Sequence, residues 1–286
     1  MPERARFFGG LVPEPPYPEA RVVILPAPLE RTVCYGKGAG RGPEAILAAS
    51  AQIEDFDEAS WRKISDAGIH TLPIPDLPED PALAVERIAE LALPVFLDGK
   101  FLVTLGGEHT VAAGAVRAAW SVWPDLGVLS LDAHADMRDS YQGTPWSHAC
   151  TMRRIVEKGI PVEWCGLRSL SAEEAAWFDE RGVRPRLDRE RDREGRWIEE
   201  LVAALPARVY LSIDIDGLDP ACAPGTGTPE PGGLSFRAAE RQLSAVASAR
   251  HLVGADVCEV APIAGQTVTE STAARLVGRI VASATC

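Results

Sequence analysis

The stretch GVLSLDAHAD at residues 127–136 starts as an apolar run of strand length and ends in two aspartates and a histidine at alternate positions. Two other stretches have a similar form, FLVTLGGEH at residues 101–109 and RVYLSIDID at residues 208–216. Alternate side chains of an extended chain point in the same direction. Each stretch therefore predicts a strand that ends in side chains able to bind a metal ion.

Around these stretches, apolar runs of strand length alternate with helix-like segments. The predicted strands are Arg21–Pro26, Phe101–Leu105, Gly127–Leu131, Val162–Leu167, Arg208–Ile213 and Leu252–Val257. The predicted helices begin near Pro43 and cover Pro81–Leu93, Thr110–Trp120, Ala149–Lys158, Ala172–Glu180, Phe236–Ala249 and Thr272–Ser283, with Pro94 expected to end or kink the second. Such alternation requires crossover connections, so we expect an α/β fold with a mainly parallel sheet covered on both faces.

Composition narrows the classes of function. The chain has 286 residues, 46% of them hydrophobic, which is enough to bury a large core. Its formal charge of -12 argues against nucleic acid as a partner and weakly favours a cationic ligand. The six cysteines form no CxxC pair, which indicates a reducing compartment. The start does not resemble a signal peptide and no apolar run would span a membrane, so we expect a cytoplasmic protein.

The three motifs are expected to meet, because ligands of such sheets collect outside the carboxyl ends of the strands. The candidate metal ligands are His109, Asp132, His134, Asp136, Asp214 and Asp216. Carboxylates and imidazoles without thiolates suit Mn²⁺ or another hard to intermediate divalent ion. Two divalent ions would balance the four aspartate charges, which without cations would raise one another's pKa. The sequence predicts a two-metal hydrolytic site, with a single ion as the alternative.

These motifs resemble the signatures of the ureohydrolases, the arginase and agmatinase family of binuclear manganese amidinohydrolases, and the resemblance runs from about Arg21 to the end. It implies a three-layer α/β/α fold, arginase-like, in one domain over residues 1–286 with residues 1–20 as an N-terminal extension. It also implies a homotrimer or homohexamer. The ligand assignment that it implies gives one Mn²⁺ to His109 and Asp136, the other to His134 and Asp216, and a bridging role to Asp132 and Asp214.

The resemblance also implies catalytic roles for residues outside the three motifs. His148 matches the family histidine that shuttles protons, and a departing guanidino nitrogen needs such a proton. Glu259 matches the family carboxylate that pairs with the guanidinium, whose forked N–H donors need such an acceptor. The predicted catalytic residues are therefore His148, Glu259 and the metal ligand Asp136.

Two departures from the arginase pattern bear on the substrate. Arginases carry Asn at the position of Arg138 and Asp at the position of Ser171, and use them to hold the amino acid head. Their absence argues against arginine. Residues 136–141 and 261–263 resemble agmatinases, including those that act on aminopropyl derivatives. We predict hydrolysis of agmatine or an N-substituted agmatine, such as aminopropylagmatine, to urea and a polyamine by metal-bridging hydroxide.

Other activities remain as alternatives. Arg138 would suit a carboxylate tail, as in a guanidinobutyrase, and arginase and formimidoylglutamase are further ureohydrolase activities. A hydrolase of acyl-lysine-like amides on the same fold would use one zinc with fewer carboxylates. A binding protein without catalysis is disfavoured, because an unused cluster of aspartates would destabilise the fold.

Overall fold

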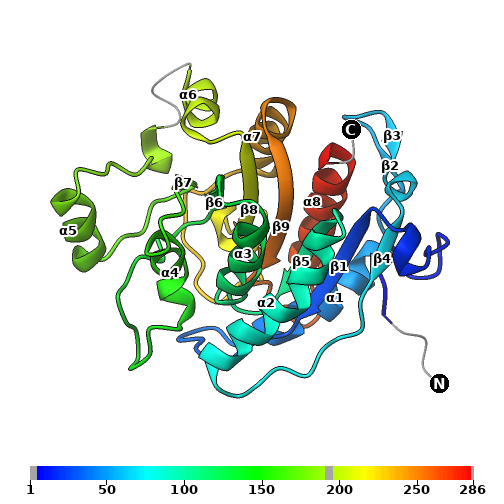
Figure 1. Ribbon diagram of the computed structural model, residues 1–286, viewed down its shortest axis with the longest axis horizontal. Helices are drawn as coiled ribbons and strands as arrows, with labels where there is room; N and C mark the ends of the chain where they lie inside the picture. Colours follow the sequence, from blue (N-terminus) through cyan, green and yellow to red (C-terminus); the bar gives the residue numbers. More distant parts are fainter. Residues whose placement is uncertain (1–4, 191–195, 285–286) are drawn as a thin grey trace.

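The computed structural model describes residues 5–190 and 196–284, and within them the main sheet has seven strands. The strands are β1 (Val22–Ala27), β4 (Ile69–Thr71), β5 (Phe101–Gly106), β6 (Leu126–Leu131), β7 (Val162–Cys165), β8 (Arg208–Asp214) and β9 (His251–Cys258). Their order is β4-β1-β5-β9-β8-β6-β7, and all neighbouring pairs are parallel. The predicted strands and the parallel sheet are confirmed (Figure 1).

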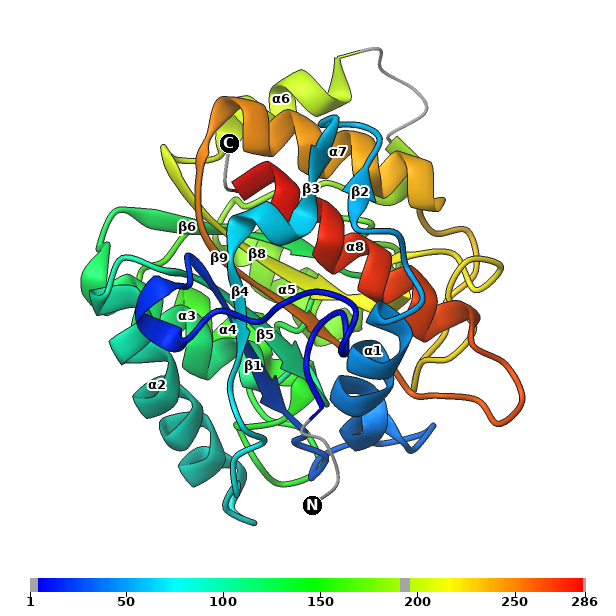
Figure 2. The same ribbon diagram turned by 90° about the vertical axis from the view of Figure 1, so that its right-hand side faces the viewer.

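Helices cover both faces of this sheet. They are α1 (Gly42–Ser50), α2 (Pro81–Leu97), α3 (Val111–Val122), α4 (Thr151–Val156), α5 (Ala172–Glu180), α6 (Trp197–Ala204), α7 (Phe236–Ala249) and α8 (Val268–Ala284). One hydrophobic cluster joins the sheet to α1, α6, α7 and α8, and a second joins its other face to α2, α3, α4 and α5. Figure 2 shows α1, α7 and α8 on one side of the strands and α2 and α3 on the other. The fold therefore has three layers.

The two-residue period of the strands produces this arrangement. In β1, Val22 and Ile24 belong to the first cluster, whereas Val23 and Leu25 belong to the second. All four side chains are buried. A strand buried on both faces is apolar throughout, which is why the sheet could be predicted from continuous apolar runs.

The structure differs from the sequence prediction in several elements. The edge strand β4 was not predicted, because it has only three residues and His70 lies in the middle of it. The helix α6 was not predicted either, since only two of its residues, Trp197 and Leu201, are buried. Of the two effects predicted for Pro94, a helix end or a kink, the first was wrong: α2 continues to Leu97, and the carbonyl of Pro94 accepts a hydrogen bond from the N–H of Asp98.

The described N-terminal residues pack on the body of the protein. Phe7 and Phe8 are buried, and their N–H groups donate to the hydroxyls of Thr71 and Ser50. Residues 1–4 of the predicted extension lie outside the described residues, as do residues 191–195 and 285–286 of the predicted domain. The assignment of one domain to residues 1–286 therefore stays a prediction.

A small hairpin of β2 (Phe56–Asp57) and β3 (Arg62–Lys63) lies outside the main sheet. Within the described residues, no helix combines the length and apolar character that crossing a bilayer requires.

The strand order places the three motifs side by side. The strands β5, β9, β8 and β6 are neighbours at the centre of the sheet. The chain runs directly from β5 through α3 to β6, yet β9 and β8 lie between these two strands. Such a reversal of strand order opens a crevice at the carboxyl ends.

Candidate metal centre

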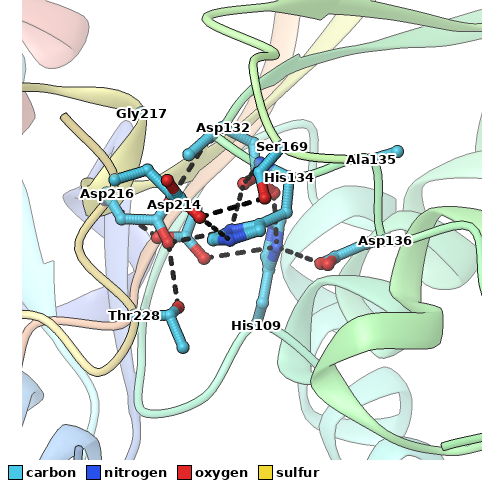
Figure 3. A network of polar contacts seen from close by, with 12 residues as sticks. His109, Asp132, His134, Ala135, Asp136, Ser169, Asp214, Asp216, Gly217 and Thr228 are labelled. Atoms are coloured by element: carbon cyan, nitrogen blue, oxygen red, sulfur yellow. Dashed lines mark hydrogen bonds and ion pairs between the residues drawn. The ribbon is translucent and has the colours of Figure 1, made fainter. Parts of the chain in front are cut away.

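All six candidate ligands meet at the carboxyl ends of β5, β6 and β8 (Figure 3). His109 follows β5 and precedes α3, while Asp132, His134 and Asp136 follow β6. Asp214 is the last residue of β8, and Asp216 lies in the following 3-10 helix, Ile215–Gly217. The structure therefore brings together the side chains that the sequence selected.

The carboxylates converge on the same nitrogen of each imidazole. Nδ1 of His109 lies 2.8 Å from Oδ2 of Asp136, 3.2 Å from Oδ2 of Asp132 and 3.7 Å from Oδ2 of Asp214. Nδ1 of His134 lies 3.1 Å from Oδ2 of Asp216 and 3.7 Å from Oδ1 of Asp132. The two oxygens of Asp132 thus face different histidines.

These residues fit a pair of metal ions. One group of ligand atoms from His109, Asp132 and Asp214 lies within 4.8 Å of one another, and a second group comes from Asp132, His134 and Asp216. Asp132 belongs to both. Its buried Oδ2 atom lies 3.2 Å from Nδ1 of His109 and meets no other donor among the described residues, which leaves it able to bind a cation. Oxygen and imidazole donors around a shared carboxylate are ligands that suit a pair of divalent metal ions.

Local backbone contacts hold the aspartates in place. Oδ1 of Asp132 accepts a 2.6 Å hydrogen bond from the N–H of His134, and Oδ1 of Asp214 accepts one of 2.9 Å from Asp216. These are Asx turns, in which a short carboxylate binds the N–H two residues on. Gly107 is required before His109, because a Cβ there would lie 2.0 Å from the carbonyl oxygen of Leu29.

Two residues of the site have strained backbones. Asp136 has φ 53° and Glu259 has φ 62°, in the left-handed region that favours glycine. Such conformations persist where the surrounding contacts outweigh their cost, and they are concentrated at functional sites.

Burial and repulsion between like charges raise the pKa values of two aspartates in the site. Burial and the charge of Asp132 raise the pKa of Asp136 to about 7. Burial, with the charges of Asp216 and Asp132, raises the pKa of Asp214 well above its usual value. Burial lowers the pKa of His109, but hydrogen bonds to Asp132 and Asp136 outweigh it and raise that pKa well above the ordinary value. Protons thus stand where cations would otherwise balance the charge.

Glu259 lies at the end of β9, on the wall of the same cavity. Its Oε1 accepts a 2.7 Å hydrogen bond from the backbone N–H of His109. The cavity has a volume of about 230 Å³, and His134, Asp136 and Asp214 also line it. Burial raises the pKa of Glu259 to about 8.

His148 lines the cavity from the short 3-10 helix His148–Cys150. Oγ1 of Thr32 donates to Oε1 of Glu108 at 3.0 Å and accepts from the backbone N–H of His148 at 3.1 Å. Its second lone pair can accept from Nδ1 of His148, 3.2 Å away. This direction of donation puts the proton on Nδ1 and leaves a lone pair on Nε2. Burial lowers the pKa of His148 below its usual value. At neutral pH the imidazole is uncharged, as a proton shuttle needs to be before it takes up a proton.

Comparison with known proteins agrees with this geometry. The sequence model of the family described as "Arginase family" matches residues 20–283, which is most of the chain. The chain belongs to the arginase family. Its predicted resemblance to ureohydrolases is thereby confirmed.

Relatives and solved structures of this arginase-family chain cover nearly its whole length. An N(1)-aminopropylagmatine ureohydrolase of Synechocystis sp. is 38% identical over 273 residues, which are 93% of this chain and 89% of the relative. An agmatinase of Pyrococcus horikoshii is 35% identical over 96% of each chain. The crystal structure of agmatine ureohydrolase of Thermoplasma volcanium has a TM-score of 0.87 at 32% identity, covering 94% of this chain and 92% of its own. The three-layer arginase-like fold is confirmed.

Several residues that contact the site of this arginase-family chain were not predicted from its sequence. Thr32 and Glu108 position His148, and Ser212 lies 2.9 Å from Nε2 of His109. Thr228 donates to Oδ2 of Asp216 at 3.2 Å. Glu108 belongs to the GGEH motif, and its complete burial is a signal that only the structure reveals. Thr32 and Thr228 lie in loops without a recognisable pattern.

The two residues that depart from the arginase pattern have different surroundings. Arg138 lines the cavity, with Cζ 5.1 Å from the centre of the Tyr141 ring and Nη1 4.0 Å from Oε2 of Glu173. Ser171 caps α5. Its hydroxyl accepts a hydrogen bond from the N–H of Glu174, and the carboxylate of Glu174 accepts one from the N–H of Ser171. Both residues line the cavity, but the hydroxyl of Ser171 is engaged in a capping box, whereas the guanidinium of Arg138 contacts Tyr141 and Glu173.

Proposed function

We propose that this chain hydrolyses the guanidino group of agmatine, or of an N-substituted agmatine such as N(1)-aminopropylagmatine, to urea and a polyamine. Relatives that carry the names agmatinase and N(1)-aminopropylagmatine ureohydrolase support this substrate class. The observation that carries the proposal is the convergence of two histidines and four aspartates, one of which, Asp132, faces both histidines.

The proposed cofactor is a pair of Mn²⁺ ions. His109 and Asp136 would hold one ion, His134 and Asp216 the other, and Asp132 and Asp214 would bridge them. The two groups of ligand atoms support the shared role of Asp132, and the 2.8 Å distance from Nδ1 of His109 to Oδ2 of Asp136 supports that pair; the bridging role of Asp214 follows from the family resemblance. When bound, such a pair lowers the pKa of water and supplies a nucleophile at neutral pH.

Glu259 would orient the substrate. One of its oxygens is occupied by the N–H of His109, which leaves Oε2 to accept from the guanidinium. A guanidinium beside Glu259 would lower its raised pKa and favour the ionised carboxylate, which forms charge-assisted hydrogen bonds that are stronger than neutral ones. The guanidino carbon would then lie beside the aspartates that also line the cavity, at a fixed orientation.

His148 would carry protons at the mouth of the cavity. Its Nδ1 proton is engaged by Thr32, so Nε2 is the atom that takes up and releases a proton. Protonation of the departing nitrogen allows the tetrahedral carbon to collapse to urea. The departing amine becomes the polyamine product.

A guanidinobutyrase is the second candidate. Arg138 lines the cavity, and a cationic side chain there would pair with a carboxylate tail. Glu173, 4.0 Å from Arg138, already balances part of this charge, which favours the agmatine proposal. From the family resemblance we further propose a homotrimer or homohexamer in the cytoplasm.

Urea release tests the proposal. Purified protein supplied with Mn²⁺ is offered agmatine, N(1)-aminopropylagmatine, arginine and guanidinobutyrate, with the Asp132→Asn variant as the inactive control. We expect the highest kcat/KM for agmatine or its aminopropyl derivative. Preference for guanidinobutyrate would establish the second candidate, and no urea from any of the four compounds would overturn both.

A further inference from the structure

A row of polar side chains crosses the middle of the buried sheet. Thr104, Asp256, Ser212 and Ser130 occupy β5, β9, β8 and β6, and each pairs in register with the next. All four are fully buried. Burying a carboxylate and hydroxyls in an otherwise apolar layer destabilises the fold unless each finds partners. The row therefore needs an explanation that core packing does not supply.

Through Ser212, the row contacts His109, a proposed metal ligand. Oγ of Ser212 lies 2.9 Å from Nε2 of His109 and 3.0 Å from Oδ1 of Asp256. Oδ1 of Asp256 also lies 3.3 Å from the N–H of Ile213, which donates to it. Burial raises the pKa of Asp256 to about 6, so the carboxylate is mostly ionised at neutral pH.

The direction of these hydrogen bonds follows from which side-chain groups can donate and which can only accept. An ionised carboxylate only accepts, so the hydroxyl of Ser212 donates its proton to Asp256. The oxygen of Ser212 then accepts, and the donor facing it is Nε2–H of His109. When a metal ion replaces the proton on Nδ1, the imidazole would be neutral, with its remaining proton on Nε2 and a lone pair on Nδ1. Nδ1 is the atom that faces Asp132 and Asp136.

We propose that Asp256 is a positioning residue, which acts through Ser212 to hold His109 in the tautomer whose Nδ1 binds a metal ion. Partners of this kind fix the orientation and tautomer of ligating histidines in metalloproteins. The contacts of Glu108, Thr32 and His148 have the same form, with an acid, a hydroxyl and a histidine in series. The inference rests on the proposed metal site but not on the identity of the substrate.

Truncation at two positions tests the series, and the row itself provides matched controls. Asp256→Ala and Ser212→Ala each break the path to His109. Thr104→Ala and Ser130→Ala are truncations at buried positions of the same row on the neighbouring strands, and neither residue has a recorded hydrogen bond to His109. Mn²⁺ affinity is measured on the full chain by competition with a calibrated chelator. Thermal unfolding of the metal-free proteins separates loss of fold from loss of metal.

The expected result is a roughly tenfold or greater weakening of one of the two Mn²⁺ ions in Asp256→Ala and in Ser212→Ala. The controls should retain the affinity of the parent protein within about threefold, whatever their melting temperatures. Because both variants interrupt one path, the double variant should bind Mn²⁺ no more weakly than the weaker single variant.

Three outcomes would overturn the inference: parental affinity in Asp256→Ala, an effect of Asp256→Ala without one of Ser212→Ala, or additive losses in the double variant. A parent protein that binds no Mn²⁺ and releases no urea would instead refute the proposed function. The two failures are therefore distinguishable.

Discussion

The backbone N–H of His109 donates a 2.7 Å hydrogen bond to Oε1 of Glu259. This bond ties the loop after β5 to the end of β9, so a proposed metal ligand and the proposed guanidinium acceptor keep a fixed separation. The bond occupies one oxygen of Glu259. The other oxygen, Oε2, lies next to Gly227, where an added Cβ would be 3.8 Å away. Substrate binding would therefore depend on Oε2 alone.

Replacement of Glu259 by Gln tests this division between its two oxygens. The glutamine carbonyl still accepts from the N–H of His109, but an NH₂ group replaces Oε2 and faces the guanidinium. We expect kcat/KM for agmatine to fall about 100-fold, as for loss of one charge-assisted hydrogen bond of roughly 2–3 kcal/mol. Bound Mn²⁺ should remain at the parental level in metal analysis. Glu90→Gln, at an exposed acid on α2, is the control, and parental kinetics in Glu259→Gln would remove this residue from the site.

Removal of the imidazole at position 148 should separate proton transfer from metal binding. His148→Ala is expected to lower kcat by about 100-fold, within the usual range for a general acid or base, with metal content intact. The pH profile of kcat should lose the limb that His148 contributes below its usual pKa range. His251→Ala, at an exposed histidine, is the control. Loss of metal in His148→Ala would make this residue a ligand instead.

Much of the fold was predictable because the central strands are long and buried on both faces. β5, β6, β8 and β9 each have at least six residues, most of them apolar and nearly all of them buried. Strand β4 carries no such signal, since its three residues pair only at the edge of the sheet. Tertiary packing also overrode a local rule at Pro94, where the helix continues although proline lacks the N–H for its own hydrogen bond.

The candidate ligands were predictable for a related reason. Parallel strands present their carboxyl ends at one edge, and alternate positions there point the same way. The residues that orient those ligands left no such pattern. Thr32 is 116 positions from His148, and Asp256 lies inside an apolar strand. Their roles depend on contacts across the fold, which one sequence does not display.

Asp132→Asn is the sharpest test of the shared ligand. Asparagine can still accept from the N–H of His134 through Oδ1, so the turn should be kept, but the charge that faces both histidines is lost. We expect less than one Mn²⁺ per chain and at least about a 100-fold fall in urea release. Asp139→Asn, three positions after Asp136 and exposed, is the control. Full activity with both ions retained would contradict a bridging role.

The metal-free protein should become less stable as the pH rises, because several groups of the site have raised pKa values in the folded state. Burial raises the pKa of Asp136 to about 7 and that of Glu259 to about 8, whereas unfolded acids titrate near 4. Burial lowers the pKa of His134, but Asp132 and Asp216 outweigh it and raise that pKa to about 12. The folded state therefore holds protons that the unfolded state has released. His148, with its lowered pKa, acts in the opposite direction.

Because the folded chain binds more protons between pH 5 and 9, its free energy of unfolding must fall as the pH rises through this window. In the presence of a chelator we expect the melting temperature to drop by roughly 5 °C or more from pH 5 to pH 9. Saturating Mn²⁺ should reduce or reverse the trend, since the ions replace the same protons. Metal-free Glu259→Gln should show a smaller decline, because glutamine has no proton to release. A melting temperature that rises steadily from pH 5 to 9 without metal would mean that these carboxyl groups are ionised in the folded protein, and hence that some other cation already balances them.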